Sequence, residues 1–358
     1  MPTSSVSARA ISVGAVSMRV ARGLIRAVAA LPEPVQRLIA GKPVEIDGQR
    51  LFTEVQMALR LLNALPEPHD PSLAQAREQT VDAALLLGLS TPVGEVRSIA
   101  IPTRAASVGA RVYINDPASP VEAAVVYFHG GGWVVGGLDS TDSVCRYIAA
   151  HANVAVISVD YRLAPEHRFP AGLQDAVDAY RWVRAQPQWG DVVVVAGDSA
   201  GATFSAAVCA QTLEEGAPDY QLLFYPATDL STKHRSYELF GEGFFLTGTK
   251  MDWYRERYLS DPGQATDPLV SPLLGEVAGH PPAHVAVAGF DVLRDEGLAY
   301  ADKLEAAGVP VTRQIATGHI HAFVNVIGVG QTGRRELALA VESLRAGIAA
   351  IRQSRVDP

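Results

Sequence analysis

The residue best placed to do chemistry in this sequence is a serine held between two glycines. Residues 192–196 read VVVVA, and the pentapeptide GDSAG follows at 197–201, with its serine at Ser199. A valine-rich strand buried on both faces, a tight glycine turn and a helix of small residues form the context in which a G-x-S-x-G serine acts as a nucleophile. The pattern therefore predicts that the Ser199 hydroxyl projects from the end of a sheet, above a helix N-terminus.

A serine nucleophile also needs backbone donors for the oxyanion that its attack creates. The sequence HGGGW at 129–133 follows an apolar strand expected at 123–128. Three glycines leave their N–H groups uncovered, and HGGG after a strand is the oxyanion loop of many esterases and lipases. The N–H of Ala200 would supply a further donor. His129 opens the loop and precedes Ser199, so we expect it to brace the loop rather than act as the base.

The orienting acid and the general base are expected on loops that follow later strands. The apolar stretch 284–289 leads to Asp291, whose place at a strand end favours it over Asp295, an expected first-turn helix residue. Only two histidines follow, His319 and His321, and both come after the last expected strand. The residues alone leave the choice between these two histidines open.

The elements that must position these residues alternate along the chain. Strands are expected at 96–101, 110–114, 123–128, 154–159, 192–196, 220–225, 284–289 and 309–315. Helices are expected at 140–151, 171–186, 200–214, 296–307 and 334–352. This alternation predicts an α/β fold with a mostly parallel central sheet flanked by helices.

Two regions depart from the alternation. Residues 1–92 have a helical pattern, with segments near 17–30, 51–65 and 72–88, and residues 229–262 form an aromatic-rich interval too long for a simple crossover. We therefore expect an N-terminal helical region over 1–92 and a catalytic α/β domain over 93–358 that carries 229–262 as an insertion.

Composition excludes several classes of protein. The 358 residues are 48% hydrophobic and carry a net charge of −8 without a basic block, which indicates a globular protein and argues against nucleic-acid binding. The two cysteines, Cys145 and Cys209, have no C-x-x-C spacing, so a disulfide framework or zinc site is not expected and a reducing compartment fits. Neither G-x-G-x-x-G opening a βαβ unit nor a Walker sequence occurs, so we expect no cofactor and no metal.

The N-terminus allows more than one interpretation. Residues 1–32 hold four arginines and no acidic residue, and could form a transit peptide or an amphipathic helix on a membrane surface. A helix that caps the domain, or a frayed end, is the favoured alternative. No apolar run reaches transmembrane length, so we expect no integral membrane segment and a cytoplasmic location, with peripheral membrane association left open.

Taken together, the motifs resemble the hormone-sensitive-lipase-like (bacterial family IV) carboxylesterases of the α/β-hydrolase superfamily. The resemblance covers about residues 95–350 and rests on motifs in the family's order, Ser, Asp, His. The matching stretches are HGGGW at 129–133, DYRLAPEH at 160–167, GDSAG at 197–201, DVLRDEG at 291–297 and the His321 loop. The chain departs from the family at Ala202, Val292 and Ala322, which leaves the shape of the pocket undetermined.

The resemblance implies a role for each site residue. It places the nucleophile at Ser199, the acid at Asp291 and the base at His321, because Ala322-Phe323 stands where the family has Gly-Phe. It places the oxyanion donors on Gly131, Gly132 and Ala200. It also implies a helical cap made of residues 1–92 and 229–262. Candidate substrate contacts are Trp133, Asp198, Phe244, Phe245 and Trp253.

The expected function is hydrolysis of short- to medium-chain carboxylic esters, small molecules, through an acyl-enzyme. Two alternatives use the same fold. An amidase or deacetylase would use the same triad and differ only in the leaving group, whereas a small-molecule receptor would have lost the histidine, which His321 argues against. The sequence leaves open whether the protein is a monomer or a homodimer.

Overall fold

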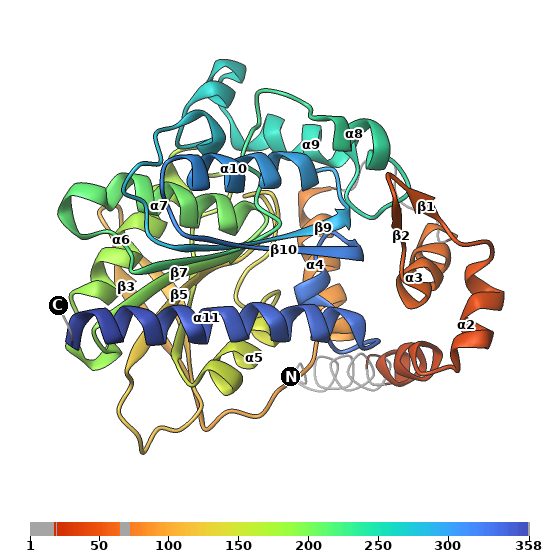
Figure 1. Ribbon diagram of the computed structural model, residues 1–358, viewed down its shortest axis with the longest axis horizontal. Helices are drawn as coiled ribbons and strands as arrows, with labels where there is room; N and C mark the ends of the chain where they lie inside the picture. The colour runs from red at the N-terminus through yellow and green to blue at the C-terminus, as the bar shows by residue number, and fades with distance from the viewer. Residues whose placement is uncertain (1–17, 19, 65–71, 357–358) are drawn as a thin grey trace, which may run out of the picture.

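An eight-stranded β-sheet forms the centre of the protein (Figure 1). In the computed structural model, which describes residues 18, 20–64 and 72–356, the strand order is β10-β9-β8-β7-β5-β6-β4-β3. The strands are β3 Glu95–Pro102, β4 Ser107–Ile114, β5 Ala123–Phe128, β6 Ala155–Asp160, β7 Val192–Asp198, β8 Tyr220–Phe224, β9 Ala283–Phe290 and β10 Val311–Ile320. They confirm the α/β fold expected from the sequence.

The direction of the strands brings the candidate loops to one edge of the sheet. From β6 through β5, β7, β8 and β9 to β10 all neighbours pair in parallel, whereas β3 and β4 pair antiparallel at the other side. Parallel strands end at the same edge, where α/β proteins build their sites. The loops after β5, β7, β9 and β10 therefore meet at the carboxyl edge.

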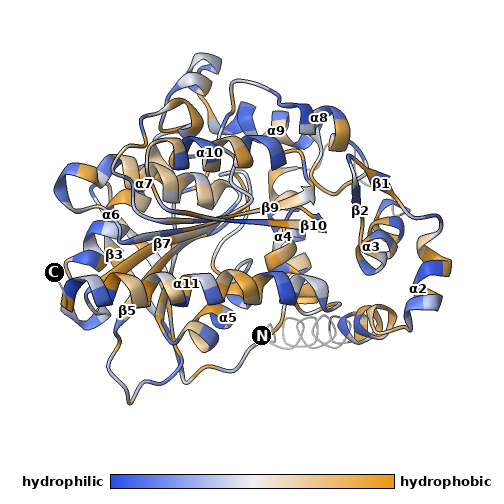
Figure 2. Ribbon diagram, viewed as in Figure 1, coloured by the Kyte–Doolittle hydropathy of each residue, from blue (hydrophilic) through white to orange (hydrophobic). Residues whose placement is uncertain are grey.

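Alternate residues of each central strand pack into two apolar layers. In β5, Ala124, Val126 and Phe128 face one layer, and Ala123, Val125 and Tyr127 face the other. The first layer lies under α6 Ala171–Arg184 and α7 Ala200–Gly216, which α10 Arg294–Ala306 continues on the same side of the sheet (Figure 1). The second lies under α5 Asp142–Ala152 and α11 Thr332–Val356. Figure 2 shows the same arrangement, with apolar colour along β5 and β7 and mixed colour along α11.

The N-terminal region is helical with one exception. Residues 20–29 are helical, and α2 Glu33–Ala40, α3 Thr53–Asn63 and α4 Leu73–Leu87 follow. The exception is a hairpin of β1 Glu45–Ile46 and β2 Gln49–Arg50, which the expectation of an all-helical region missed. Its cause is local: Asp47 and Gly48 both adopt positive φ, at 55° and 72°, as an Asp-Gly hairpin turn requires. Residues 1–17, 19 and 65–71 lie outside the described residues, as do the expectations for those parts of the chain.

The interval 229–262 contains two helices that lie beside the start of α10 (Figure 1). These are α8 Arg235–Phe240 and α9 Gly248–Tyr258, and short 3₁₀ turns follow at Pro262–Thr266 and Pro272–Leu274. The Ser236 hydroxyl donates to the carbonyl of Val292, which joins α8 to the loop after β9 at 2.5 Å.

Within residues 18, 20–64 and 72–356, no helix combines the length and apolar character needed to cross a membrane. Cys145 on α5 and Cys209 on α7 are buried and unpaired, as small core residues.

Candidate active site

A strained turn presents Ser199 between β7 and α7. Its backbone has φ 54° and ψ −122°, outside the regions that most residues occupy, and its N–H donates to Phe224 across 2.9 Å. The flanking glycines are required by space. A Cβ on Gly201 would lie 1.9 Å from the carbonyl oxygen of Phe128, and one on Gly197 would lie 2.4 Å from the carbonyl carbon of Gly201. The helix packs against the strand so closely that neither position has room for a side chain.

The structure brings Ser199, Asp291 and His321 together. The Nε2 atom of His321 lies 3.0 Å from the Ser199 Oγ, and its Nδ1 lies 2.6 Å from Asp291 Oδ2. The second carboxylate oxygen of Asp291 accepts the N–H of Leu293 at 3.0 Å. This geometry allows His321 to take a proton from the hydroxyl while Asp291 fixes the tautomer that carries hydrogen on Nδ1.

The loop that carries His321 has its own local support. The following residue, Ala322, adopts a left-handed conformation with φ 68°, which turns the chain sharply after the histidine. The Tyr225 ring lies 4.5 Å from the imidazole and packs on Phe323. His319 points elsewhere, edge-on to Phe52, and burial lowers its pKa to about 4. Of the two histidines that the residues alone left open, only His321 reaches the serine.

The glycine loop after β5 has the geometry of an anion site. Gly131 and Gly132 have φ of 120° and 57°, and a Cβ on Gly131 would lie 2.2 Å from the carbonyl oxygen of Val135. In the described part of the chain, the N–H groups of Gly131, Gly132 and Ala200 donate no hydrogen bond. The Ala200 N–H is also the first of α7, where the helix dipole adds positive potential. These three donors can therefore receive a developing oxyanion.

Asp198 holds this loop in place, and its expected contact with substrate stays a prediction. Its side chain is only 2% exposed. It accepts hydrogen bonds from the Tyr127 hydroxyl at 2.9 Å, the Gly130 N–H at 3.0 Å and the Asn325 side-chain amide at 2.8 Å. These donors come from β5, the glycine loop and the turn after His321. Burial raises the pKa of Asp198, and the three donors oppose that rise.

His129 lies beneath the glycine loop, in the bracing position that its sequence location predicts. Its ring stacks on Tyr161 at 4.2 Å, and the Tyr161 hydroxyl donates to its carbonyl at 2.7 Å. The Nδ1 atom lies 2.8 Å from the carbonyl oxygen of Gly130. Burial lowers the pKa of His129 to about 4, so the ring is neutral at pH 7.

The aromatic candidates occupy different environments. Trp133 is 2% exposed and stacks on Tyr258 at 4.3 Å, so its ring packs in the core. Phe244 also packs inward, on Phe240 and Phe290. An apolar side chain next to the core gains most by joining it, and contact of these two residues with substrate stays a prediction.

The other two candidates lie nearer to solvent. Phe245 is 40% exposed, and the Lys250 ammonium lies 5.8 Å above its ring. Trp253, on α9, is covered by the guanidinium of Arg257 at 3.8 Å. Both rings therefore contact cations of α9. Among the described residues, neither ring contacts a ring of the triad.

The sequence pattern missed the aromatic residue that does reach the site, Tyr254. A Cβ on Gly132 would lie 2.2 Å from the Tyr254 ring, so this ring lies directly over the glycine loop. Burial raises the pKa of Tyr254 to about 12, so the hydroxyl is neutral. The aromatic-rich composition of 229–262 was the available signal, but composition cannot tell which side of α9 faces the sheet.

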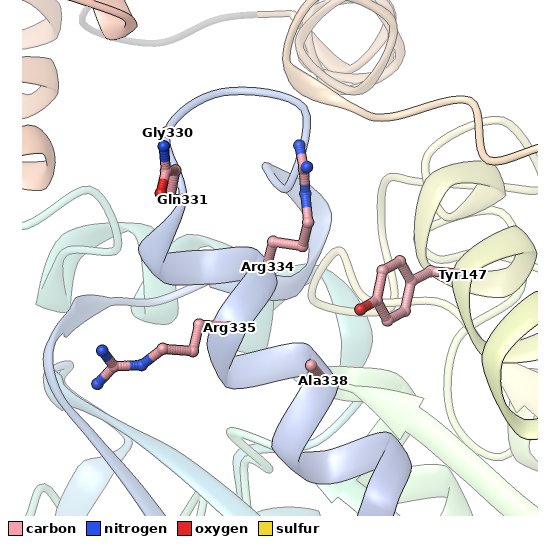
Figure 3. A pocket seen from close by; sticks show the side chains of 6 residues that line it. All are labelled: Tyr147, Gly330, Gln331, Arg334, Arg335 and Ala338. Carbon is pink, nitrogen blue, oxygen red and sulfur yellow. The ribbon is translucent and has the colours of Figure 1, made fainter.

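A separate hollow of about 490 Å³ lies between α5 and the start of α11 (Figure 3). It is lined by Tyr147, Gly330, Gln331, Arg334, Arg335 and Ala338. None of these residues belongs to the triad or to the glycine loop. In Figure 3 the two arginine side chains point in different directions, and the hollow does not form a joint cationic site.

Comparison with known proteins identifies the family of the chain. Residues 125–325 match the family described as α/β hydrolase fold, so the chain belongs to the α/β hydrolases, in their hormone-sensitive-lipase-like branch. It is 38% identical to the carboxylic ester hydrolase LipN of Mycobacterium tuberculosis, across 87% of this chain and 88% of that protein. It is 37% identical to an ethyl acetate hydrolase of Pseudomonas putida, across 76% and 89% of the two chains.

Solved structures give the same result. An esterase from Pyrobaculum calidifontis superposes with a TM-score of 0.77 and 36% identity, covering 81% of this chain and 97% of that one. A thermostable esterase from Pseudomonas putida superposes with a TM-score of 0.80 and 29% identity, covering 85% and 99%. The protein is thus a carboxylic ester hydrolase, as the sequence predicted.

Proposed function

We propose that this esterase uses Ser199 as a nucleophile and proceeds through an acyl-enzyme. The observation that carries the proposal is the continuous chain from Ser199 Oγ through His321 to Asp291, with contacts of 3.0 Å and 2.6 Å. His321 takes the hydroxyl proton as Ser199 attacks the ester carbonyl, and Asp291 stabilises the imidazolium that forms. The negative charge on the carbonyl oxygen is received by the N–H groups of Gly131, Gly132 and Ala200.

The tetrahedral intermediate collapses when His321 donates its proton to the leaving alcohol, which leaves the acyl group on Ser199. Water then enters, gives its proton to His321 and attacks the acyl carbonyl. The second tetrahedral intermediate then collapses: the bond to Ser199 Oγ breaks, His321 returns its proton to that oxygen, and the carboxylic acid is released. Every step uses the same base and the same three backbone donors.

The proposed substrates are esters with short to medium acyl chains. Support comes from the Tyr254 ring, which lies over Gly132 and limits the space beside the oxyanion site. We also infer that residues 1–92 and 229–262 act together as a cap, because α9 supplies this ring and α3 lies beside the histidine loop. A cap of this kind excludes water and sizes the acyl pocket.

The test is hydrolysis of p-nitrophenyl esters from acetyl to palmitoyl by wild type and Ser199→Ala. We expect a maximum at short or medium length, and a loss in the variant of roughly 10⁴- to 10⁶-fold in turnover with the fold intact by circular dichroism. Ser260→Ala, an exposed serine beyond α9, is the matched control and should keep full activity. Full turnover by folded Ser199→Ala would contradict the nucleophile, and no turnover by wild type would favour an amide substrate.

A further inference from the structure

A short N-terminal segment touches both loops that carry the acid and the base. This segment, Asp47–Glu54, comprises the hairpin turn, β2 and the first residues of α3. In Figure 1, β1, β2 and α3 lie beside the carboxyl ends of β9 and β10. No sequence motif marks the segment, and among the described residues no hydrogen bond, ion pair or ring contact joins it to Ser199, Asp291 or His321.

The segment holds the histidine loop at its beginning. The Phe52 N–H donates to the carbonyl of Gly318 at 3.0 Å. The Phe52 ring lies flat on Gly318, where a Cβ would come within 2.6 Å of it, and edge-on to His319 at 5.3 Å. These contacts fix the backbone three and two residues ahead of His321.

The segment also holds the histidine loop at its end. The carboxylate of Glu54 accepts the N–H groups of Gln331 at 3.1 Å and of Thr332 at 2.8 Å, together with the Thr332 hydroxyl. A carboxylate at this place caps the N-terminus of α11. Gly330 lies next to it with φ 70°, and a Cβ there would lie 2.6 Å from the carboxylate. The loop from Gly318 to Thr332 is therefore tied down on both sides of His321.

The loop of the acid is held by the hairpin. Asp47 accepts from the Arg294 guanidinium at 2.7 Å, and Arg294 begins α10, three residues after Asp291. Its other oxygen accepts from Arg235 of α8 at 3.0 Å. The Gln49 side chain lies against Gly289, where a Cβ would be 2.0 Å from its amide oxygen. One segment of eight residues thus meets both loops.

We propose that Asp47–Glu54 is a clamp that sets the position of His321 relative to Asp291 and Ser199. The inference rests on the proposed triad and adds positioning residues to it. Groups that never touch substrate can control turnover in this way, because a displacement of about 1 Å between reacting groups costs roughly a hundredfold in rate. Glu54 is the residue whose removal should loosen the clamp most, since it receives three donors.

The experiment compares Glu54→Ala and Glu54→Gln with wild type in the full chain, using p-nitrophenyl acetate. We expect Glu54→Ala to lower kcat by roughly tenfold to a hundredfold with KM unchanged. Glu54→Gln keeps one accepting oxygen and should lose less. Glu33→Ala is the matched control: it removes the same charge from an exposed helical pair with Arg37, and kcat should stay at the wild-type value.

The decisive measurement repeats Glu54→Ala in a His321→Ala background. If Glu54 acts through the imidazole, the second substitution has nothing left to displace, and the residual rate should not fall further. If Glu54→Ala lowers the rate by the same factor in the His321→Ala background, or changes only KM in the wild-type background, the clamp is overturned. If Glu54→Ala does not fold, Thr332→Val removes one donor of the same contact and should show a smaller kcat loss that also vanishes without His321. Full activity of His321→Ala by itself would instead overturn the proposed triad and the clamp with it.

Discussion

At the scale of single residues, the site depends on places where only hydrogen fits on Cα. The clearest case is the turn at 197–201, which we call the elbow. There the strand, the helix and the glycine loop converge within contact distance around Ser199. Gly201 faces the carbonyl oxygen of Phe128 at a separation that no side chain could share. The position of Ser199 therefore depends on the absence of side chains next to it as much as on its own conformation.

Replacement of Gly201 by alanine should damage both stability and activity. The new Cβ would meet the Phe128 carbonyl at 1.9 Å, so β5 and α7 must separate and the oxyanion donors must shift with them. Overpacking of this kind costs about 1–3 kcal/mol or more in the free energy of unfolding. Chemical denaturation and p-nitrophenyl acetate turnover measure the two effects.

Gly23→Ala is the control for that substitution. It lies in the N-terminal helix with open space around its Cα, so it should be neutral or stabilise by up to about 1 kcal/mol. Equal behaviour of the two variants would contradict the steric interpretation of the elbow.

At the scale of elements, α9 and the N-terminal segment approach the catalytic edge from different parts of the chain. Helix α9 brings Tyr254 over the glycine loop, whereas the segment Asp47–Glu54 reaches the loops after β9 and β10. The first contact concerns the space that a substrate can occupy. The second concerns the alignment of Ser199, His321 and Asp291.

Tyr254→Ala should move the preferred acyl length toward longer chains. Removing the ring opens space beside Gly132, so medium and long p-nitrophenyl esters should gain in kcat/KM relative to the acetate. One additional accommodated methylene contributes about 0.8 kcal/mol, or roughly fourfold. The ratio of kcat/KM values across the ester series measures the change.

Tyr254→Phe distinguishes the effect of the ring from the effect of its hydroxyl. It keeps the ring and should keep the wild-type preference. A shift of the preference in Tyr254→Phe, or an unchanged profile in Tyr254→Ala, would show that the ring does not limit the acyl site.

At the scale of the whole molecule, stability is coupled to a buried carboxyl group outside the triad. Glu296, in the first turn of α10, is fully buried and accepts the N–H groups of Thr228 at 2.8 Å and Asp229 at 3.3 Å through one oxygen. Its other oxygen has no partner among the described residues. Burial raises the pKa of Glu296 well above its usual range.

The sign of the resulting pH dependence follows from proton binding. Above the usual pKa of glutamate, the unfolded chain has lost this proton while the folded protein keeps it, so the contribution to stability falls as pH rises. Glu296→Gln removes the titration and keeps the accepting oxygen. As pH rises from 5 to 8, the unfolding free energy of Glu296→Gln should increase relative to that of wild type, by at most about 1.4 kcal/mol per pH unit. Urea denaturation across that range measures it, and a difference independent of pH would contradict a protonated Glu296 in the fold.

The sequence by itself determined the sheet, the elbow and the order of the reactive residues. Valine runs, glycine turns and alternating helices act over a few neighbouring residues, so β7, α7 and the glycine loop could be predicted where they occur. The hairpin at Asp47 was missed because a single Asp-Gly pair stands among helical segments.

Only the tertiary structure decided which side chains meet. Asp198 and Trp133 lie beside the reactive motifs in sequence, yet the fold buries both at 2% exposure. Asp198 braces the glycine loop, and Trp133 stacks on Tyr258. Tyr254 and Glu54 reach the site edge from segments 55 and 145 positions away from Ser199. Such contacts depend on how elements pack across the chain. Local patterns in the sequence do not predict that packing. The same helix could turn either face toward the sheet until its neighbours are in place.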